Sequence, residues 1–198
     1  MRPRLPPCPC CGGDAGPVLS RRGLLTGALG LAAGGLACTA PGQALAQVFG
    51  GGPRTLLIER VQTGESFDGA YWRDGRYDRD ALRQLDWLFR DPSMEEATPM
   101  DPRLFDVLAT VARRLDAAGG YQVLSGYRAP ETNAARARQS RRVSRASLHM
   151  SGMAADVRLP GQDSVGVARL AAELQIGGVG LYQRDGFVHL DCGPARRW

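Results

Sequence analysis

Lysine is absent from this 198-residue chain, and histidine is nearly absent. All 25 basic residues are arginine, and only His149 and His189 carry an imidazole. A reaction that needs an imidazole, as a metal ligand or as an acid or base, therefore has its position almost fixed. The rest of the composition is ordinary, with 43% hydrophobic and 23% charged residues. That composition excludes a polytopic membrane protein, a collagen-like repeat and a mainly disordered chain.

Cysteine is scarce outside the amino-terminal segment. Of the five cysteines, only Cys192 lies beyond residue 46. Cys8, Cys10 and Cys11 have neither a distant second cysteine pair nor nearby histidines, which excludes a zinc finger on the number of ligands. If residues 1–46 are removed, Cys192 is left alone and no disulfide can form within the chain.

Long apolar runs are also missing, and the most apolar segment has the features of an export signal. The pair Arg21-Arg22 precedes an uncharged run over 24–36, which is shorter than the ~20 residues of a membrane-spanning helix. Ala44-Leu45-Ala46 then offers a small-x-small cleavage site. Residues 1–46 resemble a twin-arginine export signal, and we predict that they act as one. Since this pathway carries folded proteins, the chain is expected to fold before export and to act in the periplasm. An uncleaved anchor and lipidation of Cys38 are the alternatives.

The excess of positive charge largely disappears with this leader. The whole chain has a formal net charge of +5, but residues 1–46 hold four of the 25 basic residues and one of the 20 acidic residues. Residues 47–198 therefore carry a net charge of +2. This balance gives no support to a nucleic-acid partner. Contact with a membrane is expected only during export or if the leader is retained.

Residues 47–198 are predicted to form one α+β domain. Hydrophobic periodicity, helix-start residues and glycine turns indicate strands and helices without a regular βαβ rhythm. We expect a central antiparallel sheet with helices on one side. The predicted strands are 55–61, 65–72, 121–125, 154–159, 179–182 and 187–191, and the predicted helices are 79–89, 102–115, 130–140 and 164–174.

Both histidines lie near carboxylates in the last quarter of the chain. His149 precedes a glycine-containing turn, Asp156 enters a predicted strand, and His189 lies inside another. If those strands are neighbours, the three side chains converge, and three such ligands leave one position of a tetrahedral zinc open for water. Spacing alone leaves a second interpretation open, in which the histidines are packed or exposed and the aspartate belongs to a turn.

Four short motifs resemble the zinc peptidases that cut cell-wall peptides. They are Ser125-Gly126-Tyr127-Arg128, the His-x6-Asp motif that joins His149 to Asp156, Gly178-Val179-Gly180-Leu181-Tyr182, and the His-x-Asp motif that joins His189 to Asp191. The group includes D-Ala-D-Ala carboxypeptidases, lysostaphin-like endopeptidases and the zinc-bearing domain of hedgehog proteins. Within it, the chain is most similar to the YcbK-like branch, the murein endopeptidase K family. The resemblance runs from about Thr55 to Trp198 and implies a hedgehog/DD-peptidase-like fold for the domain 47–198.

Carried onto this sequence, the resemblance implies a ligand set and a substrate contact. His149, Asp156 and His189 match the zinc ligands, and Arg128 matches an arginine that helps to hold a substrate or transition-state oxygen. Ser125, in the same motif as Arg128, is expected to contact substrate. A guanidinium suits this role because it presents several donors and stays charged.

The residue that handles the proton is less defined by the resemblance. Some relatives have glutamate three residues before the last ligand, where this chain has Gly186, and others use a histidine that this chain lacks. Asp191 follows His189 by two residues and points to the same face of a strand. We favour Asp191 as the catalytic base, with orientation of the His189 imidazole as its other role. Asp185, beside a turn glycine, is the alternative base.

These observations predict a zinc-dependent murein endopeptidase whose partner is the peptide stem of peptidoglycan. Zinc lowers the pKa of a bound water to roughly 7 and polarises the scissile carbonyl. The arginine-rich segment 139–145 is a candidate rim for stem carboxylates. A D-Ala-D-Ala carboxypeptidase and a noncatalytic zinc-bearing peptidoglycan-binding domain are the alternatives. A Cys192–His189 protease pair is disfavoured, because residues three apart on a strand point to opposite faces.

Overall fold

The computed structural model describes residues 52–117, 119–141 and 143–198. The predicted leader (1–46), its cleavage site and Cys38 lie outside the described residues. Within the described part of the chain, no helix combines the length and apolarity needed to cross a bilayer.

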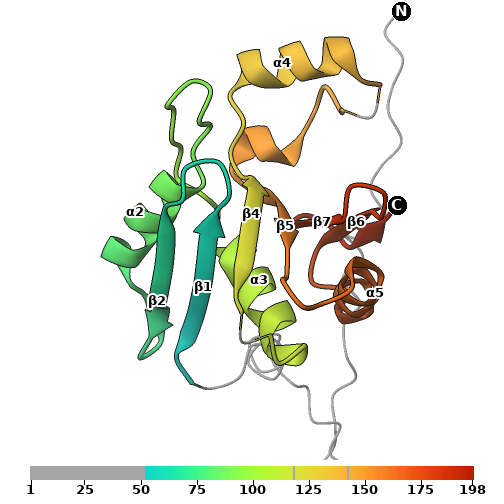
Figure 1. Ribbon diagram of the computed structural model, residues 1–198. Coiled ribbons are helices and arrows are strands. Elements are labelled where there is room, and N and C mark those ends of the chain that lie inside the picture. Colours follow the sequence, from blue (N-terminus) through green and yellow to red (C-terminus); the bar gives the residue numbers. More distant parts are fainter. Residues whose placement is uncertain (1–51, 118, 142) are drawn as a thin grey trace, which may run out of the picture. The chain divides into compact units, whose positions relative to one another are not determined.

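The described chain forms strands and helices in the predicted order (Figure 1). Three short elements were not predicted, β3, β8 and the 3-10 helix η1, because elements of two to four residues show no periodicity. The elements are β1 (Arg54–Arg60), β2 (Ser66–Arg73), β3 (Arg76–Tyr77), α2 (Arg79–Leu88), α3 (Pro102–Arg114), β4 (Tyr121–Ser125), α4 (Pro130–Gln139), η1 (Leu148–Ser151), β5 (Ala154–Arg158), α5 (Ser164–Leu174), β6 (Gly178–Tyr182), β7 (Phe187–Asp191) and β8 (Arg196–Arg197).

One eight-stranded sheet runs through this domain in the order β3-β2-β1-β4-β5-β7-β6-β8. Most neighbouring strands are antiparallel, which confirms the predicted α+β class. Two pairs are parallel, because β1 runs parallel to β4 and β6 runs parallel to β8. The parallel pairing of β1 with β4 is possible because a hairpin and two helices lie between them, a crossover long enough to return the chain to the same end.

Three helices pack on one face of the sheet and enclose the core. Helix α3 contacts β1, β7 and α5, and α2 joins this layer where Phe89 meets Phe105 edge-on. Val188 and Leu190 of β7 point into this core, whereas the alternate residues of β7 point to the other face. The face that the helices leave uncovered therefore receives His189 and Asp191.

Helix α4 stands apart from these layers. It lies beyond the end of β4 in Figure 1, and Asn133 is its only buried residue. Its position is therefore not set by packing of an apolar face on the sheet.

A β-bulge turns the end of β4 toward the uncovered face. Val123 pairs with Val157 and Ser125 pairs with Asp156, so β4 has one more residue than β5 across this interval. In a regular strand, Ser125 would share the core face of Val123, because the two residues are two positions apart. The bulge instead brings Ser125 beside Asp156.

Candidate active site

The candidate ligands come from η1 and from two neighbouring strands. Asp156 and His189 are register partners on β5 and β7, as the predicted convergence requires. His149 lies in η1, where the Ser147 hydroxyl accepts a hydrogen bond from the His149 amide over 3.4 Å. Gly152 ends η1 with φ of 66°, a left-handed conformation that glycine adopts without strain, and the chain then enters β5.

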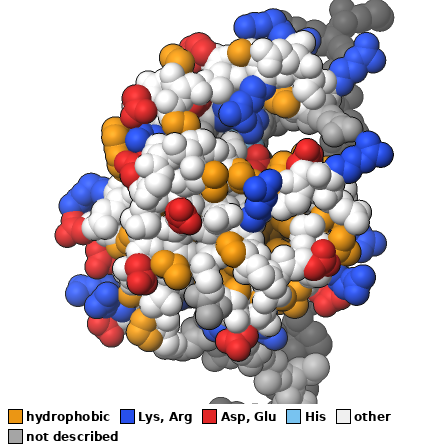
Figure 2. Space-filling model, in the orientation of Figure 1, with side chains coloured by type: hydrophobic (Ala, Val, Ile, Leu, Met, Phe, Trp, Pro, Cys, Tyr) orange, Lys and Arg blue, Asp and Glu red, His pale blue; other side chains and the backbone are white. Residues whose placement is uncertain are grey.

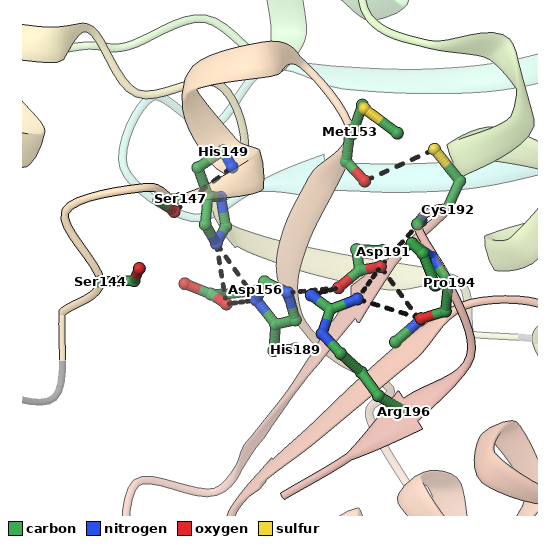
Figure 3. Close-up of polar contacts among 12 residues, drawn as sticks. Ser144, Ser147, His149, Met153, Asp156, His189, Asp191, Cys192, Pro194 and Arg196 are labelled. Atoms are coloured by element: carbon green, nitrogen blue, oxygen red, sulfur yellow. Dashed lines mark hydrogen bonds and ion pairs between the residues drawn. The ribbon is translucent and has the colours of Figure 1, made fainter. Parts of the chain in front are cut away.

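Three ligand atoms meet at one point (Figure 3). His149 Nε2 lies 3.2 Å from His189 Nδ1 and 3.3 Å from Asp156 Oδ1, and His189 Nδ1 lies 3.0 Å from the same oxygen. Two ligands of a tetrahedral zinc, each about 2.0–2.1 Å from the ion, are roughly 3.3 Å apart. The spacing of this His-Asp-His cluster (His149, Asp156, His189) therefore fits a tetrahedral ion of zinc size.

The outer nitrogen of each imidazole faces an acceptor. His149 Nδ1 donates to the Gly126 carbonyl over 2.7 Å, and His189 Nε2 donates to Asp191 Oδ2 over 3.1 Å. These bonds leave a lone pair on His149 Nε2 and on His189 Nδ1, both aimed at the Asp156 carboxylate. In this protonation state three acceptors converge and could hold a cation, and such outer contacts are usual for metal-bound histidines.

Electrostatic interactions within the cluster keep Asp156 ionised. Burial alone would raise the pKa of Asp156, but when the imidazoles of His149 and His189 are protonated instead, their charges and hydrogen bonds outweigh burial and lower that pKa. Burial likewise opposes protonation of His189, but hydrogen bonds to Asp156 and Asp191 raise its pKa above the ordinary value. The carboxylate is thus in the form that binds a cation.

Asp191 lies behind His189, on the side away from the other two ligands (Figure 3). It is fully buried, and its oxygens accept from the amides of Gly178 and Gly193 and from the Arg196 guanidinium, at 2.7–3.2 Å. Burial would raise the pKa of Asp191, but the bonds from His189 and the two amides lower it to about 2. This environment suits a carboxylate that orients an imidazole better than one that accepts a proton from water.

Arg128 and Ser125 lie beside the cluster. Arg128 Nη2 is 3.8 Å from Asp156 Oδ2 and donates to Ser125 Oγ over 3.3 Å, while Nη1 donates to Asn133 Oδ1 over 3.2 Å. The Arg128 side chain is buried, which lowers its pKa. Within the described residues, the buried Nε has no hydrogen-bond partner. The guanidinium is thus fixed within reach of a group bound at the cluster.

The cluster opens into a cavity of about 520 Å³ between α4 and the carboxyl-terminal strands. Figure 2 shows a hollow below α4 with basic side chains at its edges. Asp156 is the only acidic residue among the described residues that line the cavity. Asp185 is exposed in the turn between β6 and β7 and does not line it. Of the predicted rim segment 139–145, Val143 and Ser144 line the cavity, whereas Arg145 lines a separate groove.

Sequence reasoning missed several residues around the cavity. Asn133 ties α4 to Arg128, Arg196 ties β8 to Asp191, and the Trp198 ring lies 5.2 Å from the His189 ring. Trp198 is held at the edge of β6, where its amide donates to Val179 and its carbonyl accepts from Leu181, both over 3.1 Å. Asn133 lies five residues after Arg128, so a contact between them could have been predicted, but nothing in the sequence indicated that residues 196–198 return to the site.

Comparison with known proteins gives one consistent result. The family model described as peptidoglycan L,D-endopeptidase MepK (Peptidase_M15_2) matches residues 49–198. The chain is 37% identical over 172 residues to the peptidoglycan L,D-endopeptidase MepK of Escherichia coli K12, covering 85% of this chain and 94% of the relative. It is 36% identical over 159 residues to the probable peptidoglycan L,D-endopeptidase MepK of Haemophilus influenzae, covering 80% of this chain and 86% of the relative. No solved structure matches significantly. With its sequence match over the whole described domain and a His-Asp-His cluster in its cavity, the chain belongs to the MepK family of peptidoglycan endopeptidases.

Proposed function

We propose that this chain is a zinc-dependent endopeptidase that hydrolyses peptide cross-links of peptidoglycan, with His149, Asp156 and His189 as the zinc ligands. The observation that carries the proposal is the convergence of these three ligand atoms in a cavity beside a fixed guanidinium. The choice of substrate is supported by the family match and by the printed names of the relatives. Zinc, rather than another divalent ion, is supported by the tetrahedral spacing of two nitrogens and one oxygen.

The residues of the cavity divide the work of peptide hydrolysis. A zinc ion at the cluster would supply a Lewis acid for the peptide carbonyl and an activated water near neutral pH. Arg128 adds a buried positive charge where the carbonyl oxygen gains negative charge. Ser125 and Asn133 hold the two Nη atoms of Arg128, so the guanidinium needs little reorganisation during the reaction.

We assign Asp191 a positioning role rather than that of the catalytic base. Its oxygens are enclosed by Gly178, Gly193 and Arg196, and its contact with the reacting centre runs through the His189 ring. A carboxylate there fixes the tautomer of His189 and raises its basicity as a ligand.

The supporting experiment is digestion of cross-linked muropeptides by the chain without its leader, with and without a chelator. We expect monomers from the dimers, loss of this activity with the chelator and its return with zinc. Intact dimers with trimmed terminal D-alanine would replace the proposal with a carboxypeptidase. Binding to cell walls with retained zinc and no hydrolysis between about pH 5 and pH 9 would replace it with a noncatalytic domain.

We further propose that the chain acts in the periplasm after export through the twin-arginine pathway. Peptidoglycan as the substrate of the family supports an extracytoplasmic site, and the Arg21-Arg22 signal supports the route. Replacement of both arginines by lysine should keep the protein in the cytoplasm, which fractionation would detect. Unchanged export of that variant would contradict the route.

A further inference from the structure

Helix α4 is held by the site rather than by the core. Asp91 Oδ2 accepts from the Ala129 amide at its start over 3.0 Å. Asn133, its buried residue, contacts Arg128 and donates to the Ser144 carbonyl over 3.0 Å. A polar helix of ten residues with these anchors forms a wall of the cavity, and Arg136 on its last turn lines the cavity in front of the cluster.

One of those side chains carries an uncompensated charge. Arg136 lines the cavity with Arg128, and within the described residues its side chain has no ion pair or hydrogen bond. The charge of Arg136, after burial, lowers the pKa of Arg128. Asp156, the acidic residue of the lining, is directed at the two imidazoles. Two guanidiniums on one wall of a cleft create a positive potential that attracts an anionic group.

The opposite wall is aromatic. Tyr182 and Phe187 stack with centroids 4.5 Å apart and planes inclined by 11°, and Trp198 leans on His189. A flat apolar wall accommodates the backbone and aliphatic part of a peptide. The cavity therefore suits a peptide that presents a carboxylate toward α4.

We infer that Arg136 is a specificity-determining residue that binds a free carboxylate of the peptide beside the scissile bond. This inference rests on the proposed function for the identity of the peptide. The planar guanidinium pairs with a carboxylate through two parallel hydrogen bonds, and the exposed end of Arg136 is free to do so. The carboxylate belongs either to the side chain of a diamino diacid in the cross-link or to the carboxyl terminus of a stem.

The test is calorimetric binding of a stem tripeptide that ends in a diamino diacid to the zinc-loaded protein. Four peptides are compared, with both carboxylates of the terminal diamino diacid free, with either of these two amidated, and with both of them amidated. We expect amidation of one carboxylate to weaken binding to the wild type by about ten-fold. The peptide that shows this loss identifies which carboxylate is bound.

Arg136→Gln should weaken binding of the free peptide by a similar factor and should bind the corresponding amide no more weakly than the free peptide. Arg136→Lys keeps the charge and should recover part of the affinity. Arg138→Gln, on the same helix but lining a separate groove, should bind like the wild type. Thermal unfolding of each variant checks that it is folded.

Equal losses for free and amidated peptides in Arg136→Gln, or no measurable binding of the free peptide to the wild type, would overturn the inference. Failure of the proposed function looks different. Carboxylate-dependent binding without hydrolysis of muropeptides would contradict the endopeptidase function but support carboxylate binding by Arg136. Hydrolysis with peptide binding that does not depend on the carboxylate would support the endopeptidase function but contradict the role of Arg136.

Discussion

At the scale of single residues, the surroundings of Asp191 favour one of the two roles that the sequence allowed. They favour orientation of the His189 imidazole over the role of a catalytic base. Alternation along a strand correctly predicted that both side chains share a face. It did not reveal that Gly178 and Arg196 enclose the carboxylate, because those donors come from β6 and β8. A strand of two residues has no sequence signature, so the surroundings of Asp191 required the folded chain.

Asp191→Asn is expected to weaken zinc binding by about ten-fold or more, because the imidazole of His189 loses a charged acceptor. Competition with a chromophoric chelator measures this affinity. Asp185→Asn, in an exposed turn, is the control and should bind zinc like the wild type. If Asp191→Asn binds zinc normally but hydrolyses nothing, Asp191 is the base after all.

Gly126 lies next to the site at a position where only glycine fits without a clash. A Cβ at this position would clash with the Phe89 carbonyl oxygen, and the Gly126 carbonyl is the acceptor for His149. Gly126→Ala should lower the free energy of unfolding by about 1–3 kcal/mol, as overpacking does, and should weaken zinc binding. Urea denaturation and the chelator competition measure the two effects.

The matched control is Gly69→Ala in β2, where the added Cβ would meet the Phe67 ring at 3.5 Å, an ordinary contact. This variant should keep both properties. An equal loss of stability in the two variants would show that the close approach at Gly126 is not what matters.

At the scale of elements, α4 depends on a carboxylate from another part of the chain. Its N-cap residue, Ala129, supplies no side-chain cap, and Asp91 instead accepts from the Ala129 amide and, through its other oxygen, from Ser93. Burial would raise the pKa of Asp91, but hydrogen bonds from Thr132, Ser93 and Ala129 lower it. The local sequence predicted the helix from Pro130 but gave no sign of this long-range cap.

Asp91→Asn should therefore destabilise the protein in a pH-dependent way. A lowered folded-state pKa contributes stability that is complete above the unfolded value of roughly 3.9 and is lost as the pH falls through the folded value. We expect a loss of about 1–3 kcal/mol near pH 7 and a smaller loss at an acidic pH below the folded value, by urea denaturation with chelator present. Asp80→Asn on the surface of α2 is the control. A loss that is the same at both pH values would contradict this account.

The elements themselves were the part of the fold most accessible from sequence. Helices α2, α3 and α5 begin at the predicted residues, each directly after an aspartate that caps its first turn, and the six longer strands follow the predicted runs. The parallel pairing of β1 with β4 and the bulge in β4 depend on which strands meet. A single sequence reports periodicity within an element but not the partner of each strand, so these features required the structure.

At the scale of the whole molecule, the candidate zinc ligands connect η1, β5 and β7, in the central part of the sheet. An ion that binds only the folded state stabilises it by an amount that grows with its concentration over Kd, about 2.7 kcal/mol at 100 times Kd. We therefore expect zinc to raise the thermal midpoint of the metal-free protein. His149→Ala and Asp156→Ala should abolish this rise.

The rise should shrink in mild acid. Metal binding needs neutral imidazoles. Because the pKa of His189 is raised, protons begin to compete with zinc at a pH above the ordinary histidine pKa of about 6.5, and they compete more strongly as the pH falls. Protonated His189 contributes stability to the metal-free protein below that value and loses it as the pH rises through the folded pKa. Zinc should thus raise the midpoint more near pH 7.5 than near pH 5.5, by scanning calorimetry. A rise independent of pH would argue against histidine ligation.

The place of Trp198 has a practical consequence for anyone who purifies this protein. The ring leans on His189 and the backbone is bonded to β6, so an affinity tag joined directly to Trp198 would start at the wall of the cavity. A polyhistidine tag there would bring extra imidazoles to a chain that has only two of its own. Such a tag would compete for the ion and block the entrance, so zinc content and activity should be measured on protein tagged at the amino-terminal side and cleaved.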